Sequence, residues 1–278
     1  MRHRFAIQLA SALCCATSLF ASAQQFPAKP TKVAGGYPAG GAVAIVASTV
    51  GQCMAGSLGQ AVVVENKPGA GTIIAARSVI NAAPDSHTPF LAADALAANM
   101  ALYQPAPFDG ERDRVPVSLV PRVPAVIATS AQNGAANLAQ LIEMAKAKPS
   151  FVNSATPGNG STPHLAIELV TRAAGIKLAH VPYIGGVPAI TDVLGGQLPL
   201  VAVNAVDVLP HVKSGKLRVL TVMSTARSAS LPDVPTIAES GFPESKASVW
   251  YGYVAPAATP SFTRKCSKRC KPLKLWRA

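Results

Sequence analysis

The chain has 278 residues, of which 49% are hydrophobic and 14% are charged, and its formal net charge is +12. This length is enough to bury the core of one large domain or two modest ones, and the composition excludes extensive disorder. The excess of basic residues is concentrated at the two ends: seven of the 25 Lys and Arg lie in residues 261–278 and two in residues 1–23. Residues 24–260 therefore contain 16 Lys and Arg and 13 Asp and Glu. The charge therefore does not favour a nucleic-acid partner.

The first 23 residues have the pattern of a secretory signal peptide. Arg2 and Arg4 give a positive start, residues 5–20 form an apolar stretch, and Ala21-Ser22-Ala23 is a small-residue cleavage site. The apolar stretch is short for a membrane span and contains polar residues. We expect cleavage after Ala23, and an exported protein in solution without a lipid anchor.

Strand-like apolar runs alternate with helical patterns through the body, which favours an α/β architecture with mostly parallel sheets. The first expected strand ends at residue 33. The others are expected at residues 61–64, 90–93, 117–120, 125–129, 151–154, 178–181, 200–203, 219–223 and 248–255. The first expected helix follows the loop at 38–41 and ends near residue 58. The others are expected at residues 73–81, 138–147, 165–174, 188–194 and 237–240. The extended segments around 117–129 and at 248–255 are expected to cross between two lobes.

Three details of the helices can be predicted. Cys53 lies on the apolar face of the first helix and is expected to be a buried hydrophobe. Leu165, Leu169 and Ala173 share one face of the helix at 165–174. Thr236 and Glu239 have the spacing of a capping box, which predicts the start of the short helix at 237–240.

Two glycine-containing loops, at residues 38–41 and 158–164, each follow a strand-like run and open into a helix. Such loops place unpaired backbone N–H groups at a positive helix end, which favours carboxylates and phosphates. Ordinary turns use glycine for the same conformational reasons, and Ser161 and Thr162 also fit the role of N-caps. A third strand-to-glycine segment lies at 181–186, and Asn204 ends an apolar strand. The pattern predicts two half-sites that face a shared gap and bind a small anion.

The histidines His87, His164, His180 and His211 show no metal-ligand spacing and are expected to be surface or capping residues. A hydrolase interpretation would use Ser161, Asp192 and His211, but the sequence around Ser161 is not Gly-x-Ser-x-Gly. We therefore expect no catalysis, no metal and no cofactor.

The motifs that carry a family resemblance run almost continuously from residue 26 to residue 260. They are Pro38-Ala39-Gly40-Gly41, residues 62–71, Pro84-Asp85, Ala101-Leu102-Tyr103, Gly158-Asn159-Gly160-Ser161, residues 180–186, residues 192–197, residues 231–236 and Ala255-Pro256. In these motifs the chain resembles the Bug-type periplasmic solute receptors of tripartite tricarboxylate transporters. The resemblance implies a two-lobed type 2 periplasmic-binding (Venus flytrap) fold, with lobe 1 at 24–124 and 248–260 and lobe 2 at 125–247. It also implies a periplasmic monomer that captures a small carboxylate, in part through bridging waters, and docks on membrane transporter subunits.

The ligand-binding residues that the resemblance implies come from five segments. They are Tyr37, Pro38, Gly40, Gly41, Ala42, Ala93, Asp94, Gly160, Ser161, Thr162, His164, Tyr183, Gly185, Gly186 and Asn204. The chain departs from the family pattern at several of these segments. Val43-Ala44 stands where such receptors usually carry Thr-Asp, Ala92-Ala93 replaces a commonly hydroxylated strand end, Asp94 adds a negative charge, and Val203 replaces an Asp.

After Pro260 the family pattern gives way to a basic, cysteine-containing stretch at residues 261–278. We expect this to be a frameshift or premature end that removes the C-terminal helices of the first lobe. Apolar surface left uncovered in this way would lower stability and favour aggregation. A degenerate receptor that no longer binds or transports is the alternative function, and a periplasmic serine hydrolase is a remote one.

Overall fold

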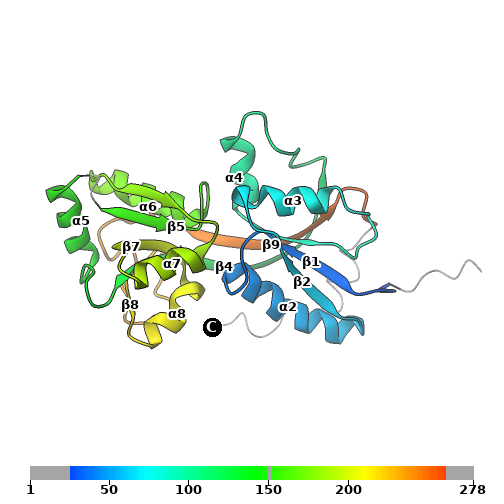
Figure 1. Cartoon of the computed structure of the whole chain (residues 1–278), viewed down its shortest axis with the longest axis horizontal. Coiled ribbons are helices and arrows are strands. Elements are labelled where there is room, and N and C mark those ends of the chain that lie inside the picture. Colours follow the sequence, from blue (N-terminus) through cyan, green and yellow to red (C-terminus); the bar gives the residue numbers. More distant parts are fainter. Residues whose placement is uncertain (1–25, 150–151, 261–278) are drawn as a thin grey trace, which may run out of the picture.

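The computed structural model describes residues 26–149 and 152–260, and the chain forms two α/β bodies joined by long strands (Figure 1). The predicted signal peptide and the basic stretch at 261–278 lie outside the described residues. The strands are β1 (Thr31–Gly35), β2 (Val62–Asn66), β3 (Phe90–Ala93), β4 (Arg114–Ser130), β5 (Asn153–Thr156), β6 (Ala179–Pro182), β7 (Leu200–Asn204), β8 (Leu217–Val222) and β9 (Ser248–Pro256). The helices are α2 (Ala42–Leu58), the 3-10 turn η2 (Ala70–Thr72), α3 (Ile73–Ile80), α4 (Ala95–Leu102), α5 (Leu138–Ala147), α6 (Thr162–Ala174), α7 (Gly186–Leu194) and α8 (Ala205–Lys213).

The strands join in the order β2-β1-β3-β9-β4-β7-β5-β6, with β8 also paired to β4. We call the part built on β1, β2 and β3 the first lobe and the part built on β5 to β8 the second lobe. Helices α2, α3 and α4 belong to the first lobe, and α5 to α8 belong to the second (Figure 1).

Two antiparallel strands, β4 and β9, cross from one lobe to the other (Figure 1). Strand β4 pairs with β9 from Arg114 to Pro124 and with β7 from Ala125 to Thr129. The two extended segments predicted around 117–129 are thus one strand, whose register shifts near its prolines accommodate residues that lack an N–H group.

The sheet is mixed, and the prediction of mostly parallel sheets was wrong. Strands β1, β2 and β3 are parallel to one another, as are β5, β6 and β7, but β4 pairs antiparallel with β7, β8 and β9, and β3 pairs antiparallel with β9. The chain must pass out of the first lobe and return to it, and this requires strands of opposite direction between the lobes.

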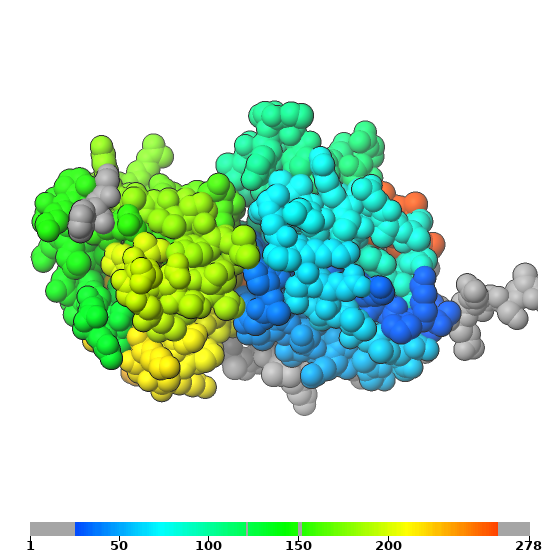
Figure 2. All heavy atoms as spheres, in the orientation of Figure 1, coloured from blue at the N-terminus to red at the C-terminus, as the bar shows by residue number. Residues whose placement is uncertain are grey.

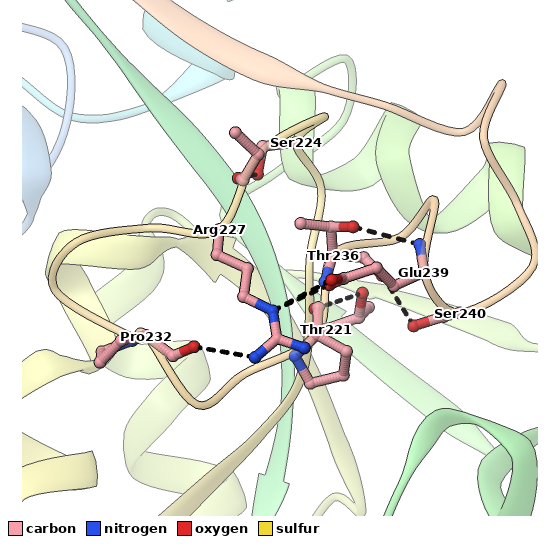
Figure 3. Close-up of polar contacts among 9 residues, drawn as sticks. Thr221, Ser224, Arg227, Pro232, Thr236, Glu239 and Ser240 are labelled. Atoms are coloured by element: carbon pink, nitrogen blue, oxygen red, sulfur yellow. Dashed lines mark hydrogen bonds and ion pairs between the residues drawn. The ribbon is translucent and has the colours of Figure 1, made fainter.

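Two helices were not predicted, and one predicted helix is a turn. Helix α4 is apolar on all sides and gives no amphipathic signal, and α8 contains Pro210, a residue typical of helix ends. The segment at 237–240 forms turns, although its capping box is present: the Thr236 amide donates to Glu239 Oε2 (2.8 Å), and the Glu239 amide donates to Thr236 Oγ1 (3.1 Å) (Figure 3).

Helix α6 packs through Ala166, Ile167 and Val170, and Leu165 and Leu169 are 44% and 43% exposed. Two burial predictions were wrong. Cys53 is only partly buried. His87 is not a surface residue but is 8% exposed, where its Nδ1 lies 2.8 Å from the carbonyl oxygen of Asp85.

The largest buried cluster runs through both lobes. It contains Val33 and Leu91 of the first lobe together with Val201 and Val208 of the second. The lobes are therefore packed against each other in a closed arrangement. Within the described residues, no helix combines the length and apolar character needed to cross a membrane.

Candidate functional site

A small cavity of about 20 Å³ lies between the lobes, which is room for about one water molecule. The starts of five helices, α2, α4, α6, α7 and α8, reach its wall. Figure 2 shows why the cavity is small: the yellow-green surface of the second lobe meets the blue surface of the first along a narrow seam. The lining residues are Tyr37, Pro38, Gly41, Ala42, Val43, Ala93, Asp94, Pro157, Ser161, Thr162, Pro163, Gly186, Val187, Asn204, Asp207, Val249 and Tyr251.

The first glycine-containing loop turns β1 into α2. Gly40 has φ +82°, a conformation that favours glycine, and Gly41 is the N-cap of α2. Gly41 has no side chain to cap the helix, so the first N–H groups of α2 need partners from elsewhere. One partner comes from the other lobe: the Ala42 amide donates a 2.7 Å hydrogen bond to Asp207 Oδ1.

Asp207 lies in the first turn of α8 and is 8% exposed. Besides the Ala42 amide, it accepts a 3.3 Å hydrogen bond from Asn204 Nδ2 and one from the Asn204 backbone. Desolvation nevertheless raises the pKa of Asp207 to about 6, because burial disfavours the charged form of the carboxylate. The carboxylate therefore acts as a cap for α8 and, across the seam, for α2.

Asp94 makes the reverse connection. It lies between β3 and α4 in the first lobe, and its carboxylate faces the amides of Ala95 and of Thr162, the first residue of α6 in the second lobe, which act to lower its pKa. Desolvation raises its pKa to about 6 as well. Each lobe thus places one carboxylate at the start of a helix in the other lobe.

The start of α6 is satisfied by groups of the protein itself. Ser161 is the N-cap and accepts a hydrogen bond from the His164 amide (3.3 Å), while its hydroxyl donates to the Gly158 carbonyl (2.8 Å). The Gly160 amide donates to His164 Nδ1 (3.2 Å), and the His164 ring stacks on His180. In this closed form the Asp94 carboxylate of the first lobe faces the predicted anion-binding loop at 160–164, near the Thr162 amide.

Helix α7 has no side-chain cap, because its N-cap residue is Gly185. Gly185 lies against the first loop: a Cβ atom there would be 2.7 Å from Pro38 Cδ. A Cβ on Gly186 would be 2.9 Å from Asp207 Oδ2. Glycine at these two positions permits the close approach of the lobes.

Two tyrosines complete the wall. Tyr37 belongs to the first loop, and desolvation raises its pKa, with further contributions from Asp94 and Asp207. Tyr251 of β9 is fully buried, and its pKa is raised by burial and then by Asp207, Tyr37 and Asp94. The Tyr251 hydroxyl and Asn204 Oδ1 have no hydrogen-bond partner within the described part of the chain.

The cavity brings together ten of the residues predicted to bind ligand. They are Tyr37, Pro38, Gly41, Ala42, Ala93, Asp94, Ser161, Thr162, Gly186 and Asn204. The other five are not among its lining residues. Gly40, Gly160 and Gly185 lie in loops, His164 stacks on His180, and the Tyr183 hydroxyl donates a 2.5 Å hydrogen bond to Asp192.

Sequence reasoning missed two polar residues of the wall, Asp207 and Tyr251. Asp207 carries a signal, since an acidic residue three positions after Asn204 is typical of a helix start. The sequence around Tyr251 carries no comparable signal beyond its place in a predicted crossing strand.

The arrangement does not support hydrolase chemistry. Ser161 serves as an N-cap, and Asp192 accepts its hydrogen bond from Tyr183 rather than from a histidine. No group of His, Cys, Asp and Glu suited to a metal ion occurs among the residues that the structure describes.

Comparisons with known proteins agree on one family. The family model described as a tripartite tricarboxylate transporter family receptor matches residues 46–269, and so extends into the segment predicted to depart from the pattern. Protein BugT of Bordetella pertussis is 38% identical over 240 residues, which cover 86% of this chain and 74% of that protein. The structure is similar to MatC from Rhodopseudomonas palustris with bound malate (TM-score 0.80, 29% identity, 85% of this chain and 81% of that chain). It is also similar to an R. palustris protein with adipate (TM-score 0.82, 28% identity, covering 85% of this chain and 79% of that chain).

Proposed function

Because this chain belongs to the family of tripartite tricarboxylate transporter receptors, we propose that it captures a small carboxylate and delivers it to a transporter of that family. Membership of a receptor family agrees with the prediction that the protein is not an enzyme, and the two-lobed fold agrees with the predicted one. The relatives named above with malate and adipate support a carboxylate as the ligand class.

The observation that carries this proposal is the convergence of five helix starts on one interlobe cavity. Each helix start carries a partial positive charge and unpaired N–H groups, so their convergence favours a negatively charged group. The described lining residues include no Lys, Arg or His, so a ligand carboxylate would be held by backbone amides and hydroxyl groups.

The proposed mechanism is closure of the two lobes about β4 and β9. In the open form, the helix starts of α2 and α6 would be free to bind a ligand carboxylate, directly or through water. On closing, Asp207 reaches Ala42 and Asp94 reaches Thr162, so the same two helix starts gain partners across the seam. The closed form would be the one that docks on the membrane subunits.

Three predictions from the sequence complete the proposal. We expect residues 1–23 to be removed after export to the periplasm, the protein to act as a monomer, and the lobes to divide at residues 124/125 and 247/248. The sheet pairing supports this division, since β4 changes its partner from β9 to β7 at Ala125.

Isothermal titration of the purified protein with a panel of carboxylates would test the function. The panel would contain malate, adipate, succinate, citrate and benzoate, and adipamide would serve as the uncharged match for adipate. We expect at least one carboxylate to bind with a Kd of about 1 µM or lower, and its amide to bind at least about tenfold more weakly.

One observation favours the alternative of a degenerate receptor: the Asp94 and Asp207 carboxylates already occupy two of the helix starts. If neither the panel nor a wider set of organic acids binds, the degenerate receptor is the better interpretation. The predicted loss of C-terminal helices stays a prediction, because residues 261–278 lie outside the described structure.

A further inference from the structure

The two segments that meet at the outer edge of the seam carry no charged side chain. Residues 33–64, which contain the first loop and α2, include no Asp, Glu, Lys or Arg, and neither do residues 181–191, which lead into α7. The charged residue that follows, Asp192, accepts the hydrogen bond of the Tyr183 hydroxyl. Because a surface helix ordinarily has charged residues on its outer face, the uncharged outer face of α2 is unusual.

Exposed apolar side chains lie on both sides of the seam at this edge. Ile45 of α2 is 44% exposed, and Ile184 and Val187 at the start of α7 are 62% and 38% exposed. The Ile45 amide donates to the Gly41 carbonyl (3.0 Å), and a Cβ atom on Gly41 would be 3.8 Å from Val187 Cγ2. Helices α2 and α7 accordingly flank the seam (Figure 1). We call Ile45, Ile184 and Val187 the seam patch.

The hydroxyl groups beside the seam patch are already paired within their own helices. Thr49 Oγ1 donates to the Ile45 carbonyl (2.9 Å), and Thr191 Oγ1 donates to the Val187 carbonyl (3.0 Å). A partner that covers the patch therefore leaves these two hydroxyls with their hydrogen bonds, and contact with an apolar surface costs little here.

The size and the position of the seam patch indicate the kind of partner. Three side chains present far less surface than the ~800 Å² per partner of a stable interface, so the patch suits a transient partner better than a permanent dimer. Binding to lipid headgroups relies on Lys and Arg, which both segments lack. Because each lobe supplies part of the patch, a partner that contacts all of it binds the closed form in preference to the open one.

We propose, on the basis of the function proposed above, that the seam patch is the surface through which the closed receptor docks on an uncharged, apolar surface of the membrane-embedded transporter subunits. Opening of the lobes separates Ile45 from Ile184 and Val187, so the open form presents only half of the surface. Since ion pairs do not contribute at the patch, docking depends little on ionic strength.

Docking can be measured with nanodiscs that contain the membrane subunits of the tripartite tricarboxylate transporter encoded in the same genome. Fluorescently labelled receptor is titrated with these nanodiscs in the presence of the carboxylate that binds in the panel above. We expect Ile45→Glu and Ile184→Glu each to weaken docking at least about tenfold. For the unmodified protein, the Kd of docking should change by about threefold or less between about 50 mM and about 500 mM NaCl.

Ile74→Glu in α3 of the first lobe and Leu169→Glu in α6 of the second are the matched controls. These side chains are 52% and 43% exposed and lie outside the seam patch, so docking should be unchanged. All four variants should bind the carboxylate as tightly as the unmodified protein, which also shows that they fold. If a glutamate variant of the patch does not fold, Ile45→Ser or Ile184→Ser replaces it and should weaken docking about threefold or more.

Equal effects of the patch and control variants on docking overturn the proposal, as does a loss of docking at high salt. Equal binding to nanodiscs without the subunits assigns the patch to lipid and overturns it as well. So does a dimer of the unmodified protein in analytical ultracentrifugation that Ile184→Glu abolishes, because the occupant is then a second copy. A protein that binds a carboxylate but does not dock refutes the seam patch alone, whereas failure to bind any carboxylate overturns the receptor function itself.

Discussion

The carboxylate of Asp207 and the amide of Ala42 are 165 positions apart in the sequence and are joined by a 2.7 Å hydrogen bond across the seam between the lobes. The bond links the start of α8 to the start of α2. It is buried and joins the two lobes, so separation of the lobes would break it. Its removal should therefore act on the equilibrium between open and closed forms.

We predict that Asp207→Ala shifts the ligand-free protein toward the open form. The Ala42 amide would lose a charged acceptor, which makes closing less favourable by about 2 kcal/mol. Small-angle X-ray scattering should then show a larger radius of gyration. Asp207→Asn is the control, because its side-chain oxygen still accepts from Ala42, and it should remain close to the compact form. Equal radii for all three proteins would contradict this prediction.

Gly185 tests closure from the other side of the seam. Its φ is 170°, an extended conformation that any residue adopts, so alanine introduces no backbone strain. The new methyl group would lie 2.7 Å from Pro38 Cδ of the first lobe and would prevent full closure. We predict that Gly185→Ala weakens ligand binding at least about tenfold, while the melting temperature of the ligand-free protein changes by about 2 °C or less.

Gly56→Ala is the matched control for that experiment. Gly56 is exposed within α2, and a Cβ atom there would meet nothing within 4 Å. The substitution should leave ligand affinity unchanged and raise stability slightly, because alanine has the higher helix propensity. If Gly185→Ala binds ligand as tightly as Gly56→Ala does, closure against Pro38 is not required.

The capping box of the second lobe should contribute to folding stability. Thr236 is 2% exposed, and its hydroxyl accepts from the Glu239 amide while Glu239 also pairs with Arg227 (Figure 3). We predict that Thr236→Ala lowers the free energy of unfolding by about 1 kcal/mol in urea denaturation, and that Thr236→Ser lowers it by less. Arg227→Ala removes an exposed ion pair and an exposed hydrogen bond from Arg227 Nη1 to the Pro232 carbonyl (3.1 Å), and should cost about 0.5 kcal/mol or less. The reverse order of effects would show that the ion pair, and not the cap, stabilises this turn.

Local signals in the sequence identified most elements correctly. Residues 90–93 and 138–147 form the predicted strand and helix with the predicted bounds, and Gly59 and Gly175 end helices in the left-handed conformation that glycine favours. The failures have local causes too. Helix α4 has no polar face to mark its period, and α8 contains Pro210, which is atypical of a helix interior.

The site was harder to predict than the fold. Glycine-containing loops at helix starts are visible in the sequence, and most of them do reach the cavity. The pairing of Asp207 with Ala42 and of Asp94 with Thr162 depends on how the lobes close, and no local pattern encodes it. For the same reason the sequence predicted an anion-binding loop at 160–164 but not that the Asp94 carboxylate of the other lobe faces it.

The two interlobe carboxylates should also make closure depend on pH. In the closed form, burial raises the pKa of Asp94 and of Asp207 to about 6, and in the open form both groups reach water and return toward their ordinary value near 4. Closing therefore takes up protons between about pH 4 and pH 6, so it is favoured at the low end of this window and becomes less favourable as the pH rises through 6. The ionisable groups that act on these carboxylates, Tyr37 and Tyr251, have raised pKa values and stay neutral throughout.

We predict that the radius of gyration of the ligand-free protein increases from pH 4.5 to pH 7.5. His164 and His180 titrate nearby, but burial lowers the pKa of both, to about 4 for His180, so their protonation would destabilise the folded protein as the pH falls and would act in the opposite direction. The double variant Asp94→Asn/Asp207→Asn isolates the carboxylates and should show a radius that does not rise with pH. If the variant retains the increase of the unmodified protein, the titrating groups lie elsewhere, and the carboxylates do not control closure.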